Sequence, residues 1–582
     1  MLLLAFALPL ATVVACLALN RAVASRWLAA AGAAALLGAA LILLGARLLG
    51  SLPIVILDYT WLELESNAVQ LLMRLDAVGW PFALLALLGG ALALLALAAA
   101  LPQSLRGFGG LVATLLIAPV ITVTGIANTD PLLLPFAWVA AALASFAALR
   151  ISGALAASAA PLTALVAGLA GALLAFAAAV ALRGADPAAE MLVAGLVAAS
   201  VLALLALGAA PLHTAVSTLA EAPAALAAAL VALGLPLLGG YTLIDFAIDL
   251  GPAAPSAWRT ALVAAGVLTL LVCGAGALRT TRMRQIAGWQ LSAQGGCLLV
   301  AAGVSEASLA LAAPLLLANL ALTTLAAFLA LAALERRAGT DDLTALGESG
   351  PFLLAGLAVL IAGASAVGVP GTLGFWGKLW LVDELRRGAP WAVPLLLAGS
   401  SLLAFGYVAP VAAFWRRGSP DGGVPAELRS AGVLAAVPAA VLLVGALVPG
   451  PLWQQWLAGV QRALAPDVAP EPPRLPGLAG LLGVVLAAAL LVIVPLAGTR
   501  TQGRRKMADP EMGAEGVIPP AALGESLRGI AMVGAPDAAL LWLYELIQQL
   551  SAVLSRLLAL FERRYYLAGL LIAMIVVILI FI

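Results

Sequence analysis

The sequence predicts an all-α polytopic membrane protein with about sixteen transmembrane helices. Its 582 residues are 64% hydrophobic and only 10% charged, with a mean hydropathy of +1.13. A soluble protein of this length could not cover so apolar a chain with polar surface. Apolar runs long enough to span a bilayer, about 20 residues each, recur along the chain with short connections. Two of these runs are interrupted by proline and glycine in matching places of two halves.

The expected spans follow directly from the apolar runs. They lie near residues 1–19, 27–46, 80–101, 109–126, 132–149, 154–182, 190–210, 222–244, 258–278, 284–304, 307–334, 351–381, 391–415, 430–449, 477–497 and 566–582. Arginine-rich loops alternate with loops that are acidic or balanced in charge. By the positive-inside rule, this alternation predicts cytoplasmic basic loops and an N-terminus outside, in the inner (cytoplasmic) membrane of the cell.

The first interrupted span contains the only histidine of the chain. Pro211 and His213 precede Glu221 and Pro223. Unwound backbone at membrane depth survives only where protein or water satisfies its polar groups, and such breaks often mark an ion or substrate pathway. The alternative is structural, because proline and glycine are common in membrane helices. We expect His213 to bond the carbonyls of the break, and Glu221 to cap a helix or transfer protons.

The second interrupted span ends at one of only two lysines. It contains Gly368, Pro370, Gly371 and Gly374, and Lys378 follows directly. The sequence predicts that Lys378 neutralises an anion, changes its protonation state, or forms an ion pair with Asp383 or Glu384, one or two helical turns further on. The residues 383–388 are expected to form an outer loop. The alternative is a lysine that extends its ammonium to the membrane surface.

The C-terminal part predicts a surface helix followed by an anchor. A polar linker at 498–535 leads to an amphipathic stretch at 536–565, with polar residues at helical spacing, and then to a charge-free span at 566–582. This helix is expected to lie along a neighbouring subunit or on the lipid surface.

Several classes of function are disfavoured. The three cysteines stand singly in apolar stretches and have no metal-ligand spacing, so no metal site is predicted. No P-loop, dinucleotide fingerprint, quinone site or iron–sulfur signature is present, so no cofactor is expected. The net charge of +1 gives no indication of a nucleic-acid partner.

Four stretches resemble the antiporter-like membrane subunits of respiratory complex I, energy-converting hydrogenases and multisubunit cation/proton antiporters. They are Pro211–Pro223 with Gly239 and Tyr241, Arg284–Gly296, Asn319–Phe328, and Gly368–Lys378. The resemblance covers roughly residues 70–420 and is most specific in the last stretch. It implies two inverted five-helix units around a chain of charged residues that carries protons.

The resemblance also implies a division of the chain. The N-terminal helices occupy residues 1–107. The first five-helix unit, called the first unit, occupies 108–250, and the second five-helix unit, called the second unit, occupies 251–417. Additional helices at 418–497 precede the linker, surface helix and anchor.

Most of the family's charged positions are replaced here. The aligned residues are Val139, Ala206, Val231 and Leu237 in the first unit and Leu320 and Thr324 in the second. Lys378 keeps its place, and Arg284 keeps a basic position at a helix end. A proton relay needs ionisable or polar groups at short intervals. The sequence therefore predicts a family fold with a largely dismantled path, whose remaining candidates are Lys378, Glu221, His213 and Arg284.

The expected function is a membrane-arm subunit, of the NADH-quinone oxidoreductase type, in a proton-translocating complex, held by other membrane subunits and the lipid bilayer. The redox chemistry would belong to other subunits. The alternatives are a subunit of a cation/proton antiporter or inorganic-carbon uptake system, or a scaffold without flux.

Overall fold

The computed structural model describes most of the chain up to residue 447. The described ranges are 3–50, 53–64, 67–102, 104–128, 133–152, 160–182, 189–210, 233–250, 254–343, 353–407 and 426–447, with the single positions 212, 222–224, 228, 230, 345, 410, 456 and 460. The predicted polar linker, amphipathic helix and C-terminal anchor lie outside the described residues. So do the predicted span at 477–497 and the first-break residues Pro211, His213 and Glu221.

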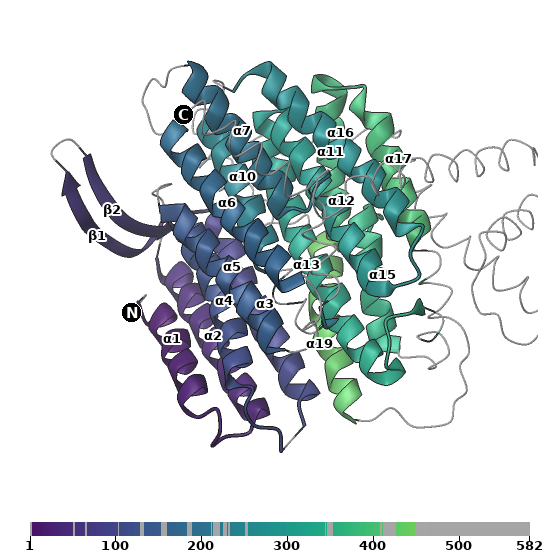
Figure 1. The fold of residues 1–582 in the computed structure, drawn as a ribbon. Coiled ribbons are helices and arrows are strands. Elements are labelled where there is room, and N and C mark those ends of the chain that lie inside the picture. Colours follow the sequence, from purple (N-terminus) through teal and green to yellow (C-terminus); the bar gives the residue numbers. More distant parts are fainter. Residues whose placement is uncertain are drawn as a thin grey trace, which may run out of the picture.

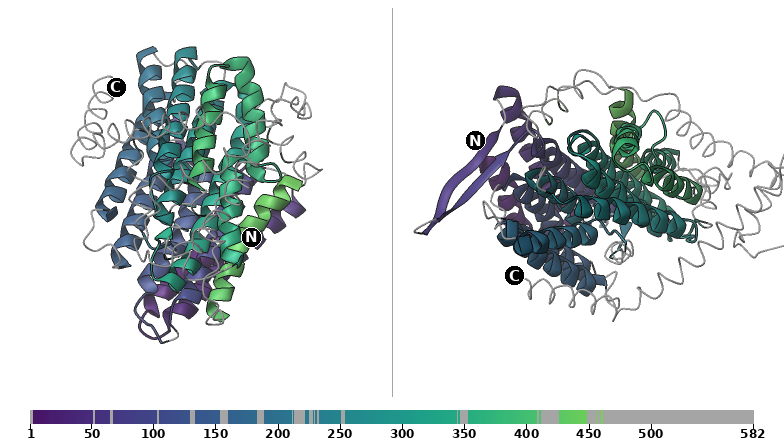
Figure 2. Two further views of the ribbon diagram at one scale, coloured as in Figure 1. Left: turned by 90° about the vertical axis from the view of Figure 1, so that its right-hand side faces the viewer. Right: turned by 90° about the horizontal axis from the view of Figure 1, so that it is seen from above.

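The described chain is a bundle of long helices with a common axial direction (Figures 1 and 2). The N-terminal helices are α1 (Leu3–Ala18), α2 (Ser25–Leu49) and α3 (Gly79–Ala100). The first unit contains α4 (Gly109–Ala127), α5 (Leu134–Ile151), α6 (Ala160–Leu182), α7 (Ala189–Ala206) and α10 (Leu235–Leu250). The second unit contains α11 (Ser256–Ala277), α12 (Met283–Val304), α13 (Glu306–Ala338), α15 (Leu353–Val367), α16 (Leu373–Gly388) and α17 (Ala392–Gly406), and α19 (Ala426–Leu447) follows it.

The helices follow the apolar runs closely. Six of the described helices are long and apolar enough to cross a membrane, and several shorter apolar helices accompany them. Their ends are set by local chemistry. The hydroxyl of Ser305 accepts the N–H of Ser308 at the start of α13, and Gly339 ends that helix with a φ of 73°. At the start of α3, the carboxylate of Asp76 accepts the N–H groups of Val78 and Gly79.

The expectation of an all-α chain is wrong in one place. Strands β1 (Ile54–Leu64) and β2 (Asn67–Leu75) pair as an antiparallel hairpin, which projects from one side of the bundle (Figure 1; Figure 2, view from above). The segment lies between two predicted spans, where the sequence predicts an acidic connecting loop. Its content of Ile, Val, Thr, Tyr and Trp suits paired strands, and pairing satisfies backbone groups that no helix satisfies here.

Helix α13 is the most buried of the six described helices that are long and apolar enough to cross a membrane. In its most apolar stretch of 18 residues, 89% of the residues are buried, and the helix packs against α12, α15, α16 and α19. At 33 residues it is about 50 Å long, longer than the roughly 30 Å hydrocarbon core. The second unit is therefore built around one continuous, unbroken helix.

Candidate functional site

The apolar run at 351–381 folds as two half-helices rather than one span. α15 ends at Val367 and α16 begins at Leu373. Gly368 and Gly371 have φ angles of 91° and 88°, in the left-handed region where a Cβ is unfavourable. The N–H of Gly368 donates to the carbonyl of Ala364 at 3.0 Å, which closes the last turn of α15. The helix is thus interrupted between Val367 and Leu373, and the outer loop expected at 383–388 is instead the last turns of α16.

Lys378 lies in the second turn of α16, and its buried side chain reaches back to this break. Only 6% of the residue is exposed, although it carries an ammonium group. Its Nζ donates to the carbonyl oxygen of Val367 and to the hydroxyl oxygen of Ser400, each at 3.0 Å. A Cβ on Gly368 would lie 2.8 Å from Cδ of Lys378. The side chain therefore crosses directly over the glycine and reaches the end of α15.

The predicted pairing of Lys378 with Asp383 or Glu384 is wrong. Both carboxylates bind Arg387 instead. Its guanidinium lies 3.1 Å from Glu384, three residues earlier, and 2.7 Å from Asp383, four residues earlier. Glu384 also accepts the hydroxyl of Ser305 at 2.9 Å. These acids point toward the end of α16, whereas the lysine side chain turns back along the helix toward the break.

A cluster of uncharged polar side chains supports the break from three helices. Asn319 of α13 donates to the side-chain carbonyl of Gln294 at 2.6 Å and accepts the hydroxyl of Ser365 at 2.6 Å. The Ser365 hydroxyl in turn accepts the N–H of Gly374 at 3.1 Å. A Cβ on Gly374 would collide with the Ser365 carbonyl oxygen, so only glycine lets the two half-helices approach this closely.

The cluster continues along the facing surfaces of α12 and α13. The amide of Gln294 donates to the Thr323 hydroxyl at 2.7 Å. Gln290, one turn earlier on α12, is fully buried, and its side-chain nitrogen and oxygen have no hydrogen-bond partner among the described residues. By contrast, the Thr324 hydroxyl donates to the carbonyl of Leu320 in its own helix, at 2.7 Å, and has no other partner among the described residues. Leu320 and Thr324, where the resemblance implies charged residues, carry no charge and lie in the core.

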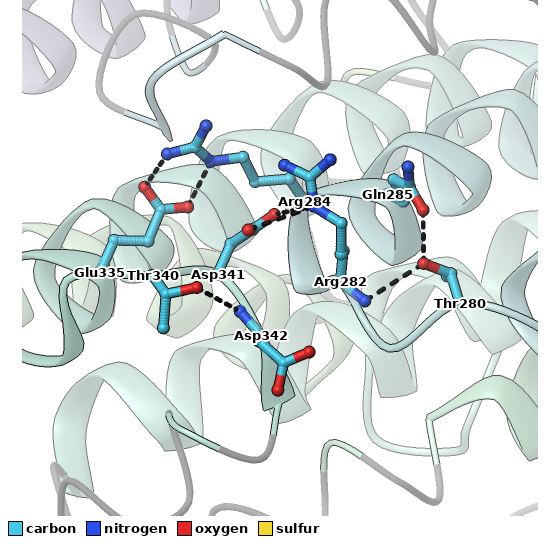
Figure 3. A network of polar contacts seen from close by, with 8 residues as sticks. All are labelled: Thr280, Arg282, Arg284, Gln285, Glu335, Thr340, Asp341 and Asp342. Carbon is cyan, nitrogen blue, oxygen red and sulfur yellow. Dashed lines mark hydrogen bonds and ion pairs between the residues drawn. The ribbon is translucent and has the colours of Figure 1, made fainter. Parts of the chain in front are cut away.

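An ion-pair network joins the start of α12 to the end of α13 (Figure 3). The guanidinium of Arg284 grips the carboxylate of Glu335 with two hydrogen bonds of 2.5 Å, and both side chains are mostly buried. Arg282 binds Asp341 at 3.1 Å. The backbone of Ala224, next to Pro223, lies close to the same carboxylate. Glu335 therefore lies near a segment of the first unit as well as near α12.

The described core of the first unit is apolar at the positions where the resemblance implies charged residues. Val139 is partly buried, and Ala206 and Leu237 are buried, while Val231 lies outside the described residues. A Cβ on Gly239 would collide with that of Ala206 and lie 3.3 Å from the Trp138 ring. Hydrocarbon side chains therefore fill these described positions.

Sequence reasoning missed four of the groups assembled here: Gln290, Glu335, Ser365 and Ser400. Glu335 carried a usable signal, since it is a single acid at the end of an apolar run, just before two arginines. The serines carried none, because serine is common in membrane helices. Among the described residues, no cluster of histidine, cysteine, aspartate and glutamate suits a metal ion.

These features define a class: a polytopic helical membrane protein with a lysine buried beside a broken helix. Comparison with known proteins finds a similarity to one family over part of the chain. Residues 140–404 match the family described as "NADH:quinone oxidoreductase/Mrp antiporter, TM". Over this range the chain is similar to the antiporter-like membrane subunits of that family.

Two curated relatives illustrate the similarity. NADH-quinone oxidoreductase subunit N of Cereibacter sphaeroides is 31% identical over 193 residues, 33% of this chain and 42% of that relative. The subunit N of a Mycobacterium species is 30% identical over 204 residues, 34% of this chain and 43% of that relative. The chain thus matches less than half the length of these relatives.

Solved structures share the fold over a longer range. The Mrp complex of Dietzia sp. matches with a TM-score of 0.71 at 22% identity, covering 92% of this chain and 59% of that chain. An archaeal membrane-bound sulfane sulfur reductase matches with a TM-score of 0.68 at 19% identity, covering 80% and 99%. Respiratory complex I of Thermus thermophilus matches with a TM-score of 0.64 at 20% identity, covering 80% and 99%.

Proposed function

We propose that this chain is a membrane-arm subunit of a multi-subunit, proton-translocating complex of the NADH-quinone oxidoreductase type. The observation that carries the proposal is the buried ammonium of Lys378 at the break between α15 and α16. An ionisable group inside a membrane bundle is costly to keep and by default marks an ion path. The names of the curated relatives and the subunit architecture of the solved structures support the same assignment.

In this proposal the two units differ in their roles. The second unit contains three separate polar groups, which are the Arg284–Glu335 pair, the Gln294–Asn319 pair and Lys378 with its two oxygen partners. The first unit, with its apolar core, acts as a packing and coupling element. The domain boundaries and the inverted relation of the two units belong to this proposal, as do the N-terminus outside and the basic loops inside the cytoplasmic membrane.

Flux through the intact complex tests the role of Lys378. The complex is purified by a tag on this chain and reconstituted into proteoliposomes. Lys378→Ala is expected to lower proton flux by about tenfold or more, since positioned proton carriers typically contribute at least that much. Lys378→Arg keeps the charge but cannot release its proton, so it should fail equally. Ser401→Ala, which removes an exposed hydroxyl bonded within its own helix, is the matched control.

Partner identity tests the assignment to a complex. Mass spectrometry of the proteins that stay bound in mild detergent should find quinone-reductase or hydrogenase subunits in stoichiometric amounts. Lys378→Ala should leave this set unchanged, whereas deletion of 536–582 should release the subunit. Full co-purification of the truncated chain would exclude the anchoring role of that segment.

A second candidate is a subunit of a cation/proton antiporter or inorganic-carbon uptake system. The likeness to the Mrp complex, which extends over 92% of this chain, favours it. Antiporter or carbon-uptake partners in the same purification would replace the first assignment with this one.

A further inference from the structure

The end of α15 is a site of the kind that holds a cation. Half-helices broken inside a membrane present unpaired carbonyls and the negative end of the helix dipole, and transporters use such ends to coordinate Na⁺ or protons. Here the last carbonyl of α15, that of Val367, faces the hydroxyl of Ser400 on α17. Carbonyl and hydroxyl oxygens are the ligands that hard cations prefer.

Lys378 fills this position with its own ammonium. Nζ lies 3.0 Å from each of the two oxygens and bridges the end of α15 to α17. Its aliphatic part passes over Gly368, where a Cβ would leave no room for it. The position of the charge is therefore built into the break and is not a chance rotamer at a helix end.

No carboxylate balances this charge among the described residues around it. The nearby titratable side chain is the thiol of Cys297, which is fully buried and neutral and offers no counter-charge. The acids on the same helix, Asp383 and Glu384, are bound by Arg387. The oxygens of Val367 and Ser400 thus bind one positive charge. No described carboxylate near them would compensate the charge of a second cation.

We infer that the ammonium of Lys378 takes the place of an alkali cation at the break, so that this site exchanges protons and excludes Na⁺. This inference deepens the proposed function and rests on it, because it takes the break to be the ion site. A second monovalent cation about 4 Å from the ammonium would bind roughly a thousandfold more weakly, from Coulomb repulsion at an effective dielectric constant of about 20. Na⁺ can enter only when the lysine is neutral or absent.

Sodium binding to the purified full chain in nanodiscs tests the inference without partners or flux. The readouts are the intrinsic fluorescence of the chain, whose 13 tryptophans include Trp376 and Trp380 on either side of Lys378 in sequence, and the midpoint of thermal unfolding. The wild-type chain should show no saturable response to NaCl beyond that to choline chloride. Lys378→Ala should gain a saturable response to Na⁺, with a matching rise in the midpoint of thermal unfolding.

Two further variants separate the site from the surroundings. Lys378→Met fills the space with an apolar side chain and should show no Na⁺ response. Adding Ser400→Ala to Lys378→Ala removes an oxygen ligand and should weaken the gained affinity at least tenfold. Saturable Na⁺ binding to the wild-type chain would overturn the inference, and so would a folded Lys378→Ala chain that ignores Na⁺. Neither result alters the partner identification, which tests the proposed function separately.

Discussion

Glu335, near the end of α13, accepts two hydrogen bonds of 2.5 Å from Arg284, near the start of α12. The backbone of Ala224 lies close to the same carboxylate. One buried acid therefore joins α12 to α13 and lies near a third segment that is far away in the sequence. The Arg282–Asp341 pair lies beside it, so two ion pairs hold the end of the α12–α13 hairpin (Figure 3).

Removing one partner of this pair is expected to be costly. Arg284→Met leaves the Glu335 carboxylate buried without its counter-charge and should lower the free energy of unfolding by about 3–5 kcal/mol. The double variant Arg284→Met/Glu335→Leu should recover much of that loss, because no uncompensated charge remains. Unfolding by SDS titration in mixed micelles measures both.

The exposed pair on α16 is the matched control for that cycle. Arg387 has a side chain that is 60% exposed, so Arg387→Ala should cost less than about 1 kcal/mol. An Arg284→Met loss no larger than this would show that solvent screens the buried pair as well.

Asn319 bonds both Gln294 and Ser365 in the polar cluster, so its replacement is expected to lower the free energy of unfolding through both partners. Asn319→Leu removes partners from Gln294 and Ser365, and each buried group left unsatisfied costs about 1–3 kcal/mol. Thr324→Val, on the same helix, removes a hydroxyl that bonds only Leu320 of its own turn. We expect this control to cost less than about 1 kcal/mol. Equal losses in the two variants would mean that the cluster adds nothing beyond ordinary helix contacts.

Gly374 is expected to tolerate no side chain. Gly374→Ala places a methyl group on the Ser365 carbonyl, so α16 must shift and lose the hydrogen bond from Gly374 N–H. The expected loss of stability is about 1–3 kcal/mol or more. Gly45→Ala, on α2, meets no atom within 4 Å and should instead stabilise its helix by up to about 1 kcal/mol. Thermal unfolding of both variants in one detergent gives the comparison.

Gln290 offers a test in the opposite direction. Its amide is fully buried without a partner among the described residues, and such groups cost about 1–3 kcal/mol. Gln290→Met keeps the volume and removes the polar atoms, so it should raise stability by a similar amount. A loss of stability would instead show that the amide binds a partner such as internal water.

The sequence predicted the helices well because a bilayer forces every spanning segment to satisfy its backbone internally. The expected run at 109–126 matches α4 at Gly109–Ala127, and that at 284–304 matches α12 at Met283–Val304. The second break followed from Gly368, Pro370 and Gly371, whose backbone preferences are local. Lys378 followed from its place beside that break.

The partners of the charged residues could not be predicted in the same way. Lys378 bonds Ser400, 22 residues away, and Arg284 bonds Glu335, 51 residues away. Such pairs depend on which helices pack together, and one-dimensional spacing does not contain that. The hairpin at Ile54–Leu75 was missed for a related reason, since its strands are stabilised by each other and not by a periodic apolar face.

The uninterrupted course of α13 has a consequence for motion in the second unit. α13 is about 50 Å long and packs against several helices, so it is held rigidly. The half-helices α15 and α16 beside it are joined through Gly368 and Gly371, which have positive φ angles. A small rotation at those glycines would separate the carbonyl of Val367 from the hydroxyl of Ser400 without displacing Asn319 or Gln294. Movement of the half-helices, and not of α13, would therefore change the hydrogen bonds of Lys378.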